Sequence, residues 1–495
     1  MASIEELLKI IKKNNKKADL DMVRLAFDFA KEAHEGQKRK SGDPYISHPL
    51  ETAIILAKMK LDLPTIIAAI LHDVAEDTQY NLVDIKKNFG DEVEKLVAGI
   101  TKLSIIKYRG DEKYAENLQK MFISMAEDIR VVLIKMADRL HNLKTLSALP
   151  EEKRERIAKE VLEIYAPIAN RLGMSQLKGE LEDLAFPYAL PEEFVWFQRE
   201  IIPKYQERLE FINNVINILK KEIKEEKIKL ISIHGRAKHF YSLYQKLLRP
   251  QYNKDVDRIY DLVAVRMIVP TISDCYKILG IIHHMWKPLI GRIKDYIAQP
   301  KPNGYQSLHT TVFATGGKIV ELQVRTPEMH EHAEYGIAAH WHYKEMDLKF
   351  FSRLKKGFSH KGYELPKKLQ WVNELVKWQK EAEDSQTYIK TLKIDAFQNR
   401  IFVLTPKGDV IDLPEEATPI DFAYYIHTDI GNRCGGVKIN GVMEKLDTKL
   451  RNGDVVEIII DRTKKSPSPD WLRIAKTASA KSKIKQQLSL HNKTI

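Results

Sequence analysis

Four residues of metal-binding type lie in the N-terminal part of the chain: His48, the adjacent His72 and Asp73, and Asp138. Imidazole nitrogens and carboxylate oxygens form a mixed ligand set that suits Mn²⁺, Fe²⁺, Co²⁺ or Zn²⁺ without choosing among these ions. A divalent cation lowers the pKa of a bound water and stabilises negative charge on a phosphoryl group. The four residues therefore predict a metal centre for hydrolytic chemistry at phosphorus.

The pair His72–Asp73 is the most informative part of this set. A single histidine on an apolar helix is more often a core residue with a satisfied hydrogen bond than a metal ligand. Here the pair directly follows the apolar run Ile66–Leu71, and a buried carboxylate is costly without a partner. The pattern therefore favours a metal ligand over a core histidine.

Two carboxylates in the middle of the chain stand within apolar runs that are typical of strands. Asp261 lies in IYDLVAVR and Glu321 lies in VELQVR. A carboxylate that borders a hydrophobic core is costly unless it is paired or binds a metal ion. The two together predict a Mg²⁺ site and a base that activates a hydroxyl nucleophile.

Basic residues flank these two carboxylates in the sequence. Arg236, Lys238 and Lys246 lie at a strand-to-helix transition, and the spacing of the two lysines predicts that they share one helix face. Such cations neutralise phosphate charge and hold reacting groups in line, although a basic surface helix is the alternative. The loop GRIKDYIAQPKPNGYQSLHTT adds Arg292, Lys294 and Lys301 for phosphates and Tyr305 as a flat surface for a base.

Hydrophobic periodicity indicates which elements must position these residues. From Asp19 to about Phe197 apolar residues recur at helical spacing, and Glu193–Lys227 is predicted to be one long charged helix that serves as a connector. Short β-rich runs then alternate with helical segments, which indicates an α/β or α+β domain. The predicted strands are Ile228–His234, Ile259–Val269, Leu308–Ala314 and Ile319–Val324, and the predicted helices are Lys238–Leu248, Ser273–Trp286 and Glu328–Tyr343.

The last third of the chain is predicted to hold a small separate unit. A helical segment, Leu365–Glu383, leads to a β-rich region between Ile394 and Ile460. The stretch from Lys464 is basic and begins a helix but is too short to bury a core, so we expect a piece of a longer protein. Turn signals separate the strands at Pro406–Gly408, Asn440–Gly441 and Asn452–Gly453.

Composition excludes several classes of protein. A chain of 495 residues with 44% hydrophobic and 30% charged residues is typical of several globular domains and not of a disordered protein. No apolar stretch reaches the ~18 residues of a membrane span, and no signal peptide begins the chain. Cys275 and Cys434 are too few for a disulfide framework, so we expect a cytoplasmic protein without a membrane partner. The net charge of +12 suits polyanionic partners and, equally, a solvated surface.

Three motifs in the N-terminal region resemble the hydrolase domain of the Rel/SpoT (stringent-response) proteins, an all-α domain of the HD phosphohydrolase superfamily. They are RKSG before His48, HDVAEDT around His72–Asp73, and ADRLHN with Asp138. The resemblance implies hydrolysis of the 3′-pyrophosphate of (p)ppGpp, with Mn²⁺ held by His48, His72, Asp73 and Asp138. It also implies that Glu76 and Asp77 handle the attacking water, where the alternative is a pair of solvated helix-end acids, and that the nucleotide is held by Arg39, Lys40, Asn142 and Thr145.

The block from Gly235 to Tyr343 resembles the Rel/SpoT synthetase domain, which has a nucleotidyltransferase-like fold. The resemblance implies transfer of pyrophosphate from ATP to the 3′-hydroxyl of GDP or GTP. Asp261 and Glu321 would bind Mg²⁺, and Glu321 would also activate the hydroxyl. Tyr305 would stack on guanine, the adenine would lie between Arg236 and Arg266, and the acceptor site would be lined by Lys301, Asn303 and His309. The stretch Arg292–Asp295 is the basic version found in members with two activities.

The region Ile394–Ile460 resembles a TGS domain, a small β-grasp-like unit also found in threonyl-tRNA synthetases and some GTPases. The resemblance implies recognition of deacylated tRNA on a ribosome, with His427 as the contact, and the alternative is a docking module with a surface histidine. The predicted domains are a hydrolase domain at 1–196, a synthetase domain with its connector at 197–345, a helical linker at 346–390, a TGS domain at 391–461 and the start of a truncated helical region at 462–495.

Three functions fit these features. The chain is an alarmone enzyme with two activities, an HD phosphohydrolase whose second domain only senses nucleotide, or a tRNA- or ribosome-binding regulator with vestigial sites. Intact Asp261, Glu321 and Tyr305 argue against the second, and intact metal ligands argue against the third. The first is therefore the predicted function. Because both reactions running together would consume ATP without net product, we also expect allostery between the sites, transmitted by the connector.

Overall fold

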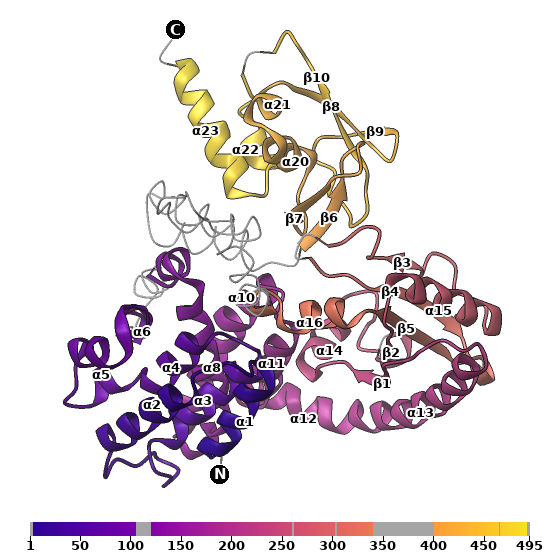
Figure 1. Ribbon diagram of the computed structural model, residues 1–495. Coiled ribbons are helices and arrows are strands. Elements are labelled where there is room, and N and C mark those ends of the chain that lie inside the picture. Colours follow the sequence, from indigo (N-terminus) through magenta and orange to yellow (C-terminus); the bar gives the residue numbers. More distant parts are fainter. Residues whose placement is uncertain are drawn as a thin grey trace, which may run out of the picture. The chain divides into compact units, whose positions relative to one another are not determined.

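The computed structural model describes residues 3–104, 120–259, 262–301, 304–339, 400–464 and 466–492 (Figure 1). The chain divides into two compact units, Met1–Ile105 with Glu127–Tyr363, and Ile106–Ala126 with Glu364–Ile495, and each is described by itself. Within the described ranges, no helix is long and apolar enough to cross a membrane. The predicted linker at 346–390 lies outside the described residues.

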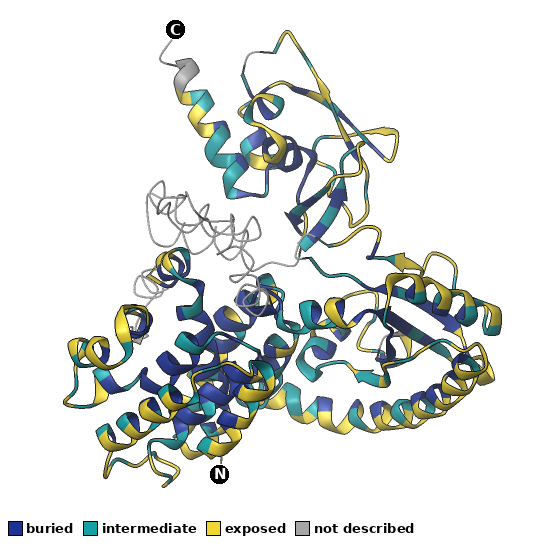
Figure 2. Ribbon diagram, viewed as in Figure 1, coloured by how far each residue is buried: buried dark blue, intermediate teal, exposed yellow. Residues whose placement is uncertain are grey.

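The N-terminal part of the first unit is built from helices, as the periodicity predicts. Asp62 begins α4 by accepting a hydrogen bond from the backbone N–H of Thr65, and Pro64 occupies the first turn, where its missing N–H costs nothing. Residues Thr65 to Leu71 of this helix are all buried, chiefly among α2, α3 and α6 (Figure 2). The helices are α1 (Ile4–Asn14), α2 (Leu20–Ala33), α3 (Ser47–Lys58), α4 (Leu63–Leu71), α5 (Val74–Asp77), α6 (Leu82–Ser104), α8 (Ile129–Lys144), α9 (Glu151–Glu160), α10 (Ala166–Arg171) and α11 (Ser175–Ala189).

The predicted connector consists of two helices, so the prediction of one long helix is wrong. α12 spans Pro191–Glu200 and α13 spans Ile202–Glu225. Pro203 lies in the first turn of α13, and because proline has no N–H and its ring crowds the carbonyl four residues earlier, the preceding helix ends there. α13 buries one side, including Ile212 and Leu219, against the next part of the unit (Figure 2).

That next part is a five-stranded sheet in the order β1-β2-β5-β4-β3. β2 and β5 run parallel, and the other neighbouring pairs are antiparallel. The predicted strands match four of these five, although the first begins later than predicted, at Ser232. The strands are β1 (Ser232–Ala237), β2 (Val263–Ile268), β3 (Lys294–Asp295), β4 (Leu308–Phe313) and β5 (Ile319–Arg325).

Side-chain alternation gives this sheet one apolar and one polar face. The apolar face packs against α13 and α15 (Ile272–Met285). A Cβ added to Gly235 of β1 would lie 3.2 Å from Ile212 of α13, so glycine allows the helix to pack close to the strand. From β2 the apolar face receives Val263, Val265 and Met267, all buried. The opposite face is left for polar side chains.

Two helices of this part differ from their predicted bounds. α14 spans Phe240–Leu247 and begins later than predicted, because His239 before it has extended backbone. Lys238 therefore lies before the helix, and the prediction that it shares a helix face with Lys246 is wrong. α16 spans Pro327–Tyr335 and ends at Gly336, whose positive φ of 55° favours glycine.

The second unit contains a two-stranded and a three-stranded sheet in the predicted β-rich region. The predicted turn signals fall between β6 and β7, between β8 and β9, and before β10. Its elements are β6 (Arg400–Leu404), β7 (Val410–Pro414), α20 (Pro419–Ile426), α21 (Thr428–Asn432), β8 (Cys434–Ile439), β9 (Val442–Glu444), β10 (Val456–Ile460), α22 (Trp471–Ile474) and α23 (Ala478–Asn492).

The segment after β10 packs onto this second unit. Trp471 and Ile484 are buried in one cluster with Tyr424 of α20. The buried carboxylate of Asp421 in α20 accepts hydrogen bonds from the backbone N–H groups of Thr418, Lys476 and Thr477. The basic C-terminal stretch, too short to bury a core alone, therefore shares the core of its neighbour.

Candidate active sites

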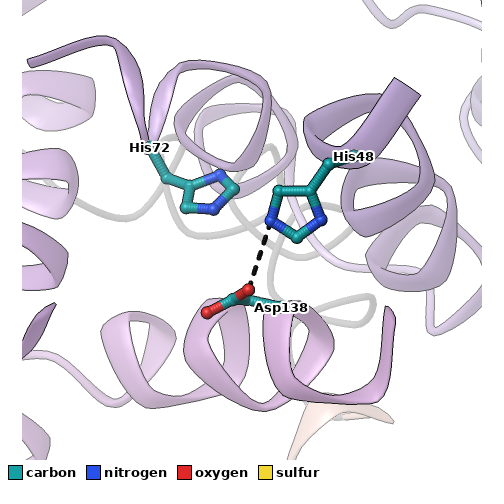
Figure 3. A group of neighbouring side chains, drawn as sticks. All are labelled: His48, His72 and Asp138. Carbon is teal, nitrogen blue, oxygen red and sulfur yellow. Dashed lines mark ion pairs between the residues drawn. The ribbon is translucent and has the colours of Figure 1, made fainter. Parts of the chain in front are cut away.

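The N-terminal candidate site lies where three helices meet (Figure 3). His48 is in the first turn of α3, His72 caps the end of α4, and Asp138 lies in α8. The three side chains are buried and point toward one another, and their ligand atoms lie within 4.8 Å of one another. Because the helix ends at His72 and the chain turns into α5, Asp73 reaches the same place.

Asp73 completes this group. Its Oδ1 lies 3.1 Å from Nε2 of His72, and its Oδ2 lies 3.6 Å from Nε2 of His48. Nε2 of His48 also lies 3.2 Å from Oδ1 of Asp138. The structure therefore brings the four predicted metal ligands together from three separate segments.

Hydrogen bonds behind each imidazole set which nitrogen faces the carboxylates. Nδ1 of His72 lies 2.8 Å from the carbonyl oxygen of Ala69, which only accepts, so Nδ1 carries the proton. Nδ1 of His141 lies 3.2 Å from a guanidinium nitrogen of Arg39, which only donates, so this Nδ1 accepts. Nδ1 of His48, 2.8 Å away, therefore donates to it. Both His48 and His72 direct an unprotonated Nε2 at the carboxylates.

Neighbouring charges keep Asp138 ionised. Burial acts to raise its pKa, but the positive charges of Lys135 and Arg139 act against burial, and the pKa lies well below its usual value. Nζ of Lys135 lies 3.0 Å from Oδ2, and the amide of Asn142 donates to Oδ1 at 2.6 Å. Burial lowers the pKa of His48, which favours its neutral form. The site thus combines neutral imidazoles with an ionised carboxylate.

This donor set fits a divalent cation. Nε2 of His72 is buried and makes no hydrogen bond within the described part of the chain. Imidazole lone pairs and carboxylate oxygens that face each other at 3.1 Å and 3.6 Å repel unless a cation lies between them. Imidazole and carboxylate are also the ligand types that bind Mn²⁺, Fe²⁺ and Zn²⁺. The group can hold a metal ion that activates water.

The residues predicted to hold a nucleotide lie at different distances from this group. Arg39 and Lys40 form a tight turn before α3 that closes at Gly42, whose φ is 91°. The guanidinium of Arg39 donates to Asn142 at 2.7 Å, so both lie beside Asp138. Lys40 is exposed on the turn, and Thr145 follows the end of α8, with Oγ1 3.4 Å from the carbonyl oxygen of Asn142.

The predicted acids Glu76 and Asp77 are exposed in α5, and Asp77 is linked to the metal group by a residue that the sequence analysis missed. The hydroxyl of Tyr45 lies 2.9 Å from Oδ2 of Asp73 and 2.9 Å from Oδ2 of Asp77. Burial raises the pKa of Tyr45, and the two carboxylates raise it further, so the hydroxyl keeps its proton and donates. Its place three residues before His48, in DPYISHP, is the signal that points to it.

The second candidate site lies on the polar face of the five-stranded sheet. Residues opposite one another in register project to the same side of a sheet. Arg266 of β2 lies between His234 of β1 and Gln323 of β5, and Gln323 in turn lies opposite His309 of β4. Glu321, two residues before Gln323, projects to the same side. Neighbouring strands therefore bring the predicted residues Arg266, His309 and Glu321 to one surface.

Glu321 is held by two of these neighbours. Gln323 donates to its Oε1 at 2.9 Å, and Nδ1 of His309 lies 3.1 Å from the same oxygen. Nε2 of His309 lies 2.7 Å from the hydroxyl of Tyr305. Burial lowers the pKa of His309, so the neutral ring donates through Nδ1 and accepts from the tyrosine through Nε2. Tyr305 is therefore connected to Glu321 through one imidazole.

Three predicted cations surround this chain of hydrogen bonds. Lys294 of β3 lies opposite His309, and Arg236 of β1 projects to the polar face. Nζ of Lys301 lies 5.3 Å from the ring centre of Tyr305. Burial lowers the pKa of Lys301, and Lys294 and Arg236 also lower it. The polar face therefore concentrates positive charge around Glu321.

The remaining predicted residues of this site are less central or not described. Lys238 lies between β1 and α14, and Lys246 lies in the last turn of α14, with Nζ 5.2 Å from the ring centre of Tyr252. Arg292 is exposed. Asp261 and Asn303 lie outside the described residues. Sequence reasoning missed Arg325 and Glu334, which contact each other behind Arg266, although an arginine ending the apolar strand VELQVR is a signal of the same kind as Glu321.

In the second unit, His427 precedes α21 and is exposed. Its Nδ1 accepts a hydrogen bond from the backbone N–H of Asp429 at 3.2 Å. Nδ1 is therefore the acceptor, and in the neutral ring Nε2 carries the proton. The side chain is accessible to a partner, as a contact residue requires.

Comparison with protein families identifies three regions of the chain. Residues 26–175 match the HD domain, residues 235–347 match the region found in RelA / SpoT proteins, and residues 401–460 match the TGS domain. An HD domain implies a divalent metal, in agreement with the buried group His48, His72 and Asp138. The three resemblances drawn from the sequence motifs are confirmed.

Curated relatives are similar along nearly the whole chain. A GTP pyrophosphokinase of Streptomyces coelicolor is 45% identical over 494 residues, 98% of this chain and 58% of the relative. A guanosine-3′,5′-bis(diphosphate) 3′-pyrophosphohydrolase of Aquifex aeolicus is 46% identical over 467 residues, 94% of this chain and 64% of the relative. The bifunctional (p)ppGpp synthase/hydrolase RelA of Mycobacterium tuberculosis is 43% identical over 486 residues, 98% of this chain and 64% of the relative.

The chain therefore spans 58% to 64% of the length of these relatives. Its three matched regions occur in the order HD, RelA/SpoT and TGS. In this domain content and in its identity to these relatives, the chain is similar to RelA/SpoT proteins over nearly its whole length.

Proposed function

We propose that the chain is an enzyme with two opposed active sites that makes and destroys (p)ppGpp. The observation that supports this most is that one chain holds two separate constellations. One is the buried group of His48, His72, Asp73 and Asp138, and the other is the pairing of Glu321 with His309 among cations on a sheet face.

For hydrolysis, the four ligands would hold Mn²⁺, which supplies an acidified water when bound. Asp77, oriented by the shared hydroxyl of Tyr45, and the neighbouring Glu76 would take and return the proton of the attacking water. Bond formation from water to phosphorus breaks the bond to the 3′-oxygen, which yields pyrophosphate and GDP or GTP. We assign binding of the (p)ppGpp nucleotide to Arg39, Lys40, Asn142 and Thr145.

For synthesis, Glu321 would act as the base that takes the proton from the 3′-hydroxyl of GDP or GTP. The oxygen attacks the β-phosphorus of ATP, and AMP leaves. Glu321 and Asp261 would hold Mg²⁺, which neutralises phosphate charge when bound. Phosphate binding is assigned to Lys238, Lys246, Arg292, Lys294 and Lys301, the adenine to Arg236 and Arg266, and the acceptor nucleotide to Asn303, Tyr305 and His309.

For the second unit, we propose contact with the acceptor end of deacylated tRNA on a ribosome. The exposed His427 supports this, because its ring presents an Nε2 donor next to the first turn of α21. The domain boundaries predicted from the sequence, at 196, 345, 390 and 461, remain part of the proposal.

One pair of assays tests the proposal. The pure protein is incubated with ATP, GDP and Mg²⁺, and separately with ppGpp and Mn²⁺. We expect ppGpp with AMP in the first reaction, and pyrophosphate with GDP in the second. Hydrolysis without synthesis would leave an HD phosphohydrolase with a nucleotide-sensing domain. Absence of both products would leave a binding protein with vestigial sites, and either outcome rejects the proposal.

Replacing Tyr305 by alanine should raise the Kd for GDP about tenfold or more, because base stacking on an aromatic ring is worth ~1–3 kcal/mol. The Kd for an ATP analogue should stay within about twofold, ~0.4 kcal/mol. Calorimetric titration measures both. Tyr305→Phe keeps the ring and loses the hydroxyl at His309, so it should bind GDP normally and synthesise more slowly. Equal losses for both nucleotides in the alanine variant would place Tyr305 elsewhere.

Replacing Tyr45 by phenylalanine should slow Mn²⁺-dependent ppGpp hydrolysis about tenfold, ~1.4 kcal/mol. The substitution removes the O–H that lies between Asp73 and Asp77 and leaves two carboxylates facing each other. Tyr80→Phe is the matched control, because the Tyr80 hydroxyl also donates to a carboxylate, that of Glu32, on the surface. If Tyr45→Phe hydrolyses ppGpp as fast as Tyr80→Phe, the hydroxyl does not orient Asp77.

A further inference from the structure

Two arginines behind the second site share one carboxylate. Glu334 of α16 accepts from Arg266 at 2.8 Å and from Arg325 at 2.9 Å, through the same Oε1. Arg325 is fully buried, Arg266 is 5% exposed, and the Glu334 side chain is 19% exposed. None of the motif-based assignments includes Glu334, which lies 68 residues from Arg266 in the chain.

This cluster is poorly suited to stabilising the fold. Burial lowers the pKa of Arg266 to about 10, and the repulsion from Arg325 adds to the shift. Nε of Arg266 and Nε and NH1 of Arg325 are buried without hydrogen bonds in the described part of the chain. An ion cluster of this kind is seldom more stable than packed apolar side chains of similar volume, so its retention points to a requirement for geometry.

The cluster of Arg266, Arg325 and Glu334 determines the orientation of the Arg266 guanidinium. The guanidinium of Arg266 has a second, longer contact to Gln323 at 3.5 Å, on the polar face of the sheet. Glu334 therefore provides the short, charged contact that fixes the plane of the guanidinium. Without that charge, Arg325 would repel Arg266 at close range, and only Gln323 would hold it.

The position of Glu334 is itself firmly held. The N-cap Thr326 begins α16, and the carbonyl oxygen of the neighbouring Ala333 accepts a hydrogen bond from the hydroxyl of Ser175 in α11. Glu331, on the same helix, pairs with Lys60 before α4. These contacts hold α16 against the N-terminal helices, and they therefore fix the position of the Glu334 carboxylate relative to the sheet.

We propose that Glu334 is a positioning residue for ATP binding: it orients Arg266 so that the guanidinium can lie flat against the adenine. The inference rests on the proposed function, in which Arg236 and Arg266 enclose that base. It predicts a selective effect on one of the two nucleotides. The charge of Glu334 matters for ATP and not for GDP, whose proposed contacts are Tyr305 and His309.

The test compares Glu334→Gln with the wild-type chain. Glutamine keeps the length of the side chain and removes its charge, so KM for ATP should rise about tenfold, ~1.4 kcal/mol, with kcat within about threefold. KM for GDP and the rate of ppGpp hydrolysis should not change. Glu334→Asp, which retains the charge, should recover part of the ATP affinity. Glu328→Gln is the matched control, because Glu328 is an exposed carboxylate on the same helix.

Calorimetric titration with a non-hydrolysable ATP analogue, together with thermal unfolding, distinguishes failure of the proposed function from failure of the positioning role of Glu334. If the wild-type chain makes no alarmone and binds no analogue, the proposed function fails. If the wild-type chain is active but Glu334→Gln binds the analogue as tightly as Glu328→Gln does, the positioning role is wrong. Parallel losses of ATP affinity, GDP affinity and thermal stability would show a purely structural role and would also overturn it.

Discussion

Replacing Asp73 by alanine should reduce ppGpp hydrolysis by at least about a thousandfold, ~4 kcal/mol in activation free energy, and should spare synthesis. Its two oxygens lie 3.1 Å from His72 and 3.6 Å from His48, between the two imidazole nitrogens that are free of protons. The substitution removes one metal ligand and also the carboxylate to which Tyr45 donates. No other described carboxylate lies as near to both imidazoles, so the activated water is lost.

The measurement is Mn²⁺-dependent release of pyrophosphate from ppGpp, combined with the metal content of the purified variant. Asp91→Ala is the matched control, because Asp91 is an exposed aspartate of the same domain that pairs only with Lys86 among described residues. Synthesis from ATP and GDP should be unchanged in both variants. Hydrolysis in Asp73→Ala at a rate near that of the control would exclude Asp73 as a metal ligand.

Replacing Glu321 by glutamine should nearly abolish synthesis, by at least about a hundredfold, ~2.7 kcal/mol, and leave hydrolysis intact. Glutamine has nearly the same shape and can still accept from Gln323, but it has no negative charge for Mg²⁺ and cannot take a proton. It also weakens the 3.1 Å contact with His309, which connects the carboxylate to Tyr305.

Formation of AMP from ATP and GDP measures this loss, and the matched control is again the exposed Glu328→Gln. Binding of the ATP analogue and GDP without Mg²⁺ should remain within about threefold, ~0.7 kcal/mol, since neither nucleoside depends on this charge. Synthesis in Glu321→Gln within about tenfold of wild type, ~1.4 kcal/mol, would show that Glu321 is not the base.

The sequence by itself determined the elements that carry both sites, because local signals specify local structure. The apolar run before His72 predicts α4, and the buried helix follows from it. Val263–Ile268 and Ile319–Arg325 were predicted as strands from their composition, within a few residues. The motifs likewise predicted four metal ligands, and the structure brings these four residues together.

Sequence patterns predicted the wrong helix bounds in two places, the connector and the beginning of α14. The connector divides at Pro203, which the charge pattern of the long segment concealed. Lys238 precedes α14 because His239 stays extended, with its ring 2.8 Å from Asp183 of α11. A contact between α11 and the residue before α14 thus accompanies the later beginning of a helix that periodicity placed only approximately.

Only the tertiary structure decided which side chains assist the predicted ones. His48 contacts His141 across 93 residues, Tyr45 joins Asp73 to Asp77, and Glu334 reaches Arg266 across 68 residues. Histidine, tyrosine and glutamate are common in surface helices and carry no periodic signal of such a role. Their function depends on hydrogen bonds of about 3 Å, which exist only after helices and strands far apart in the chain have packed.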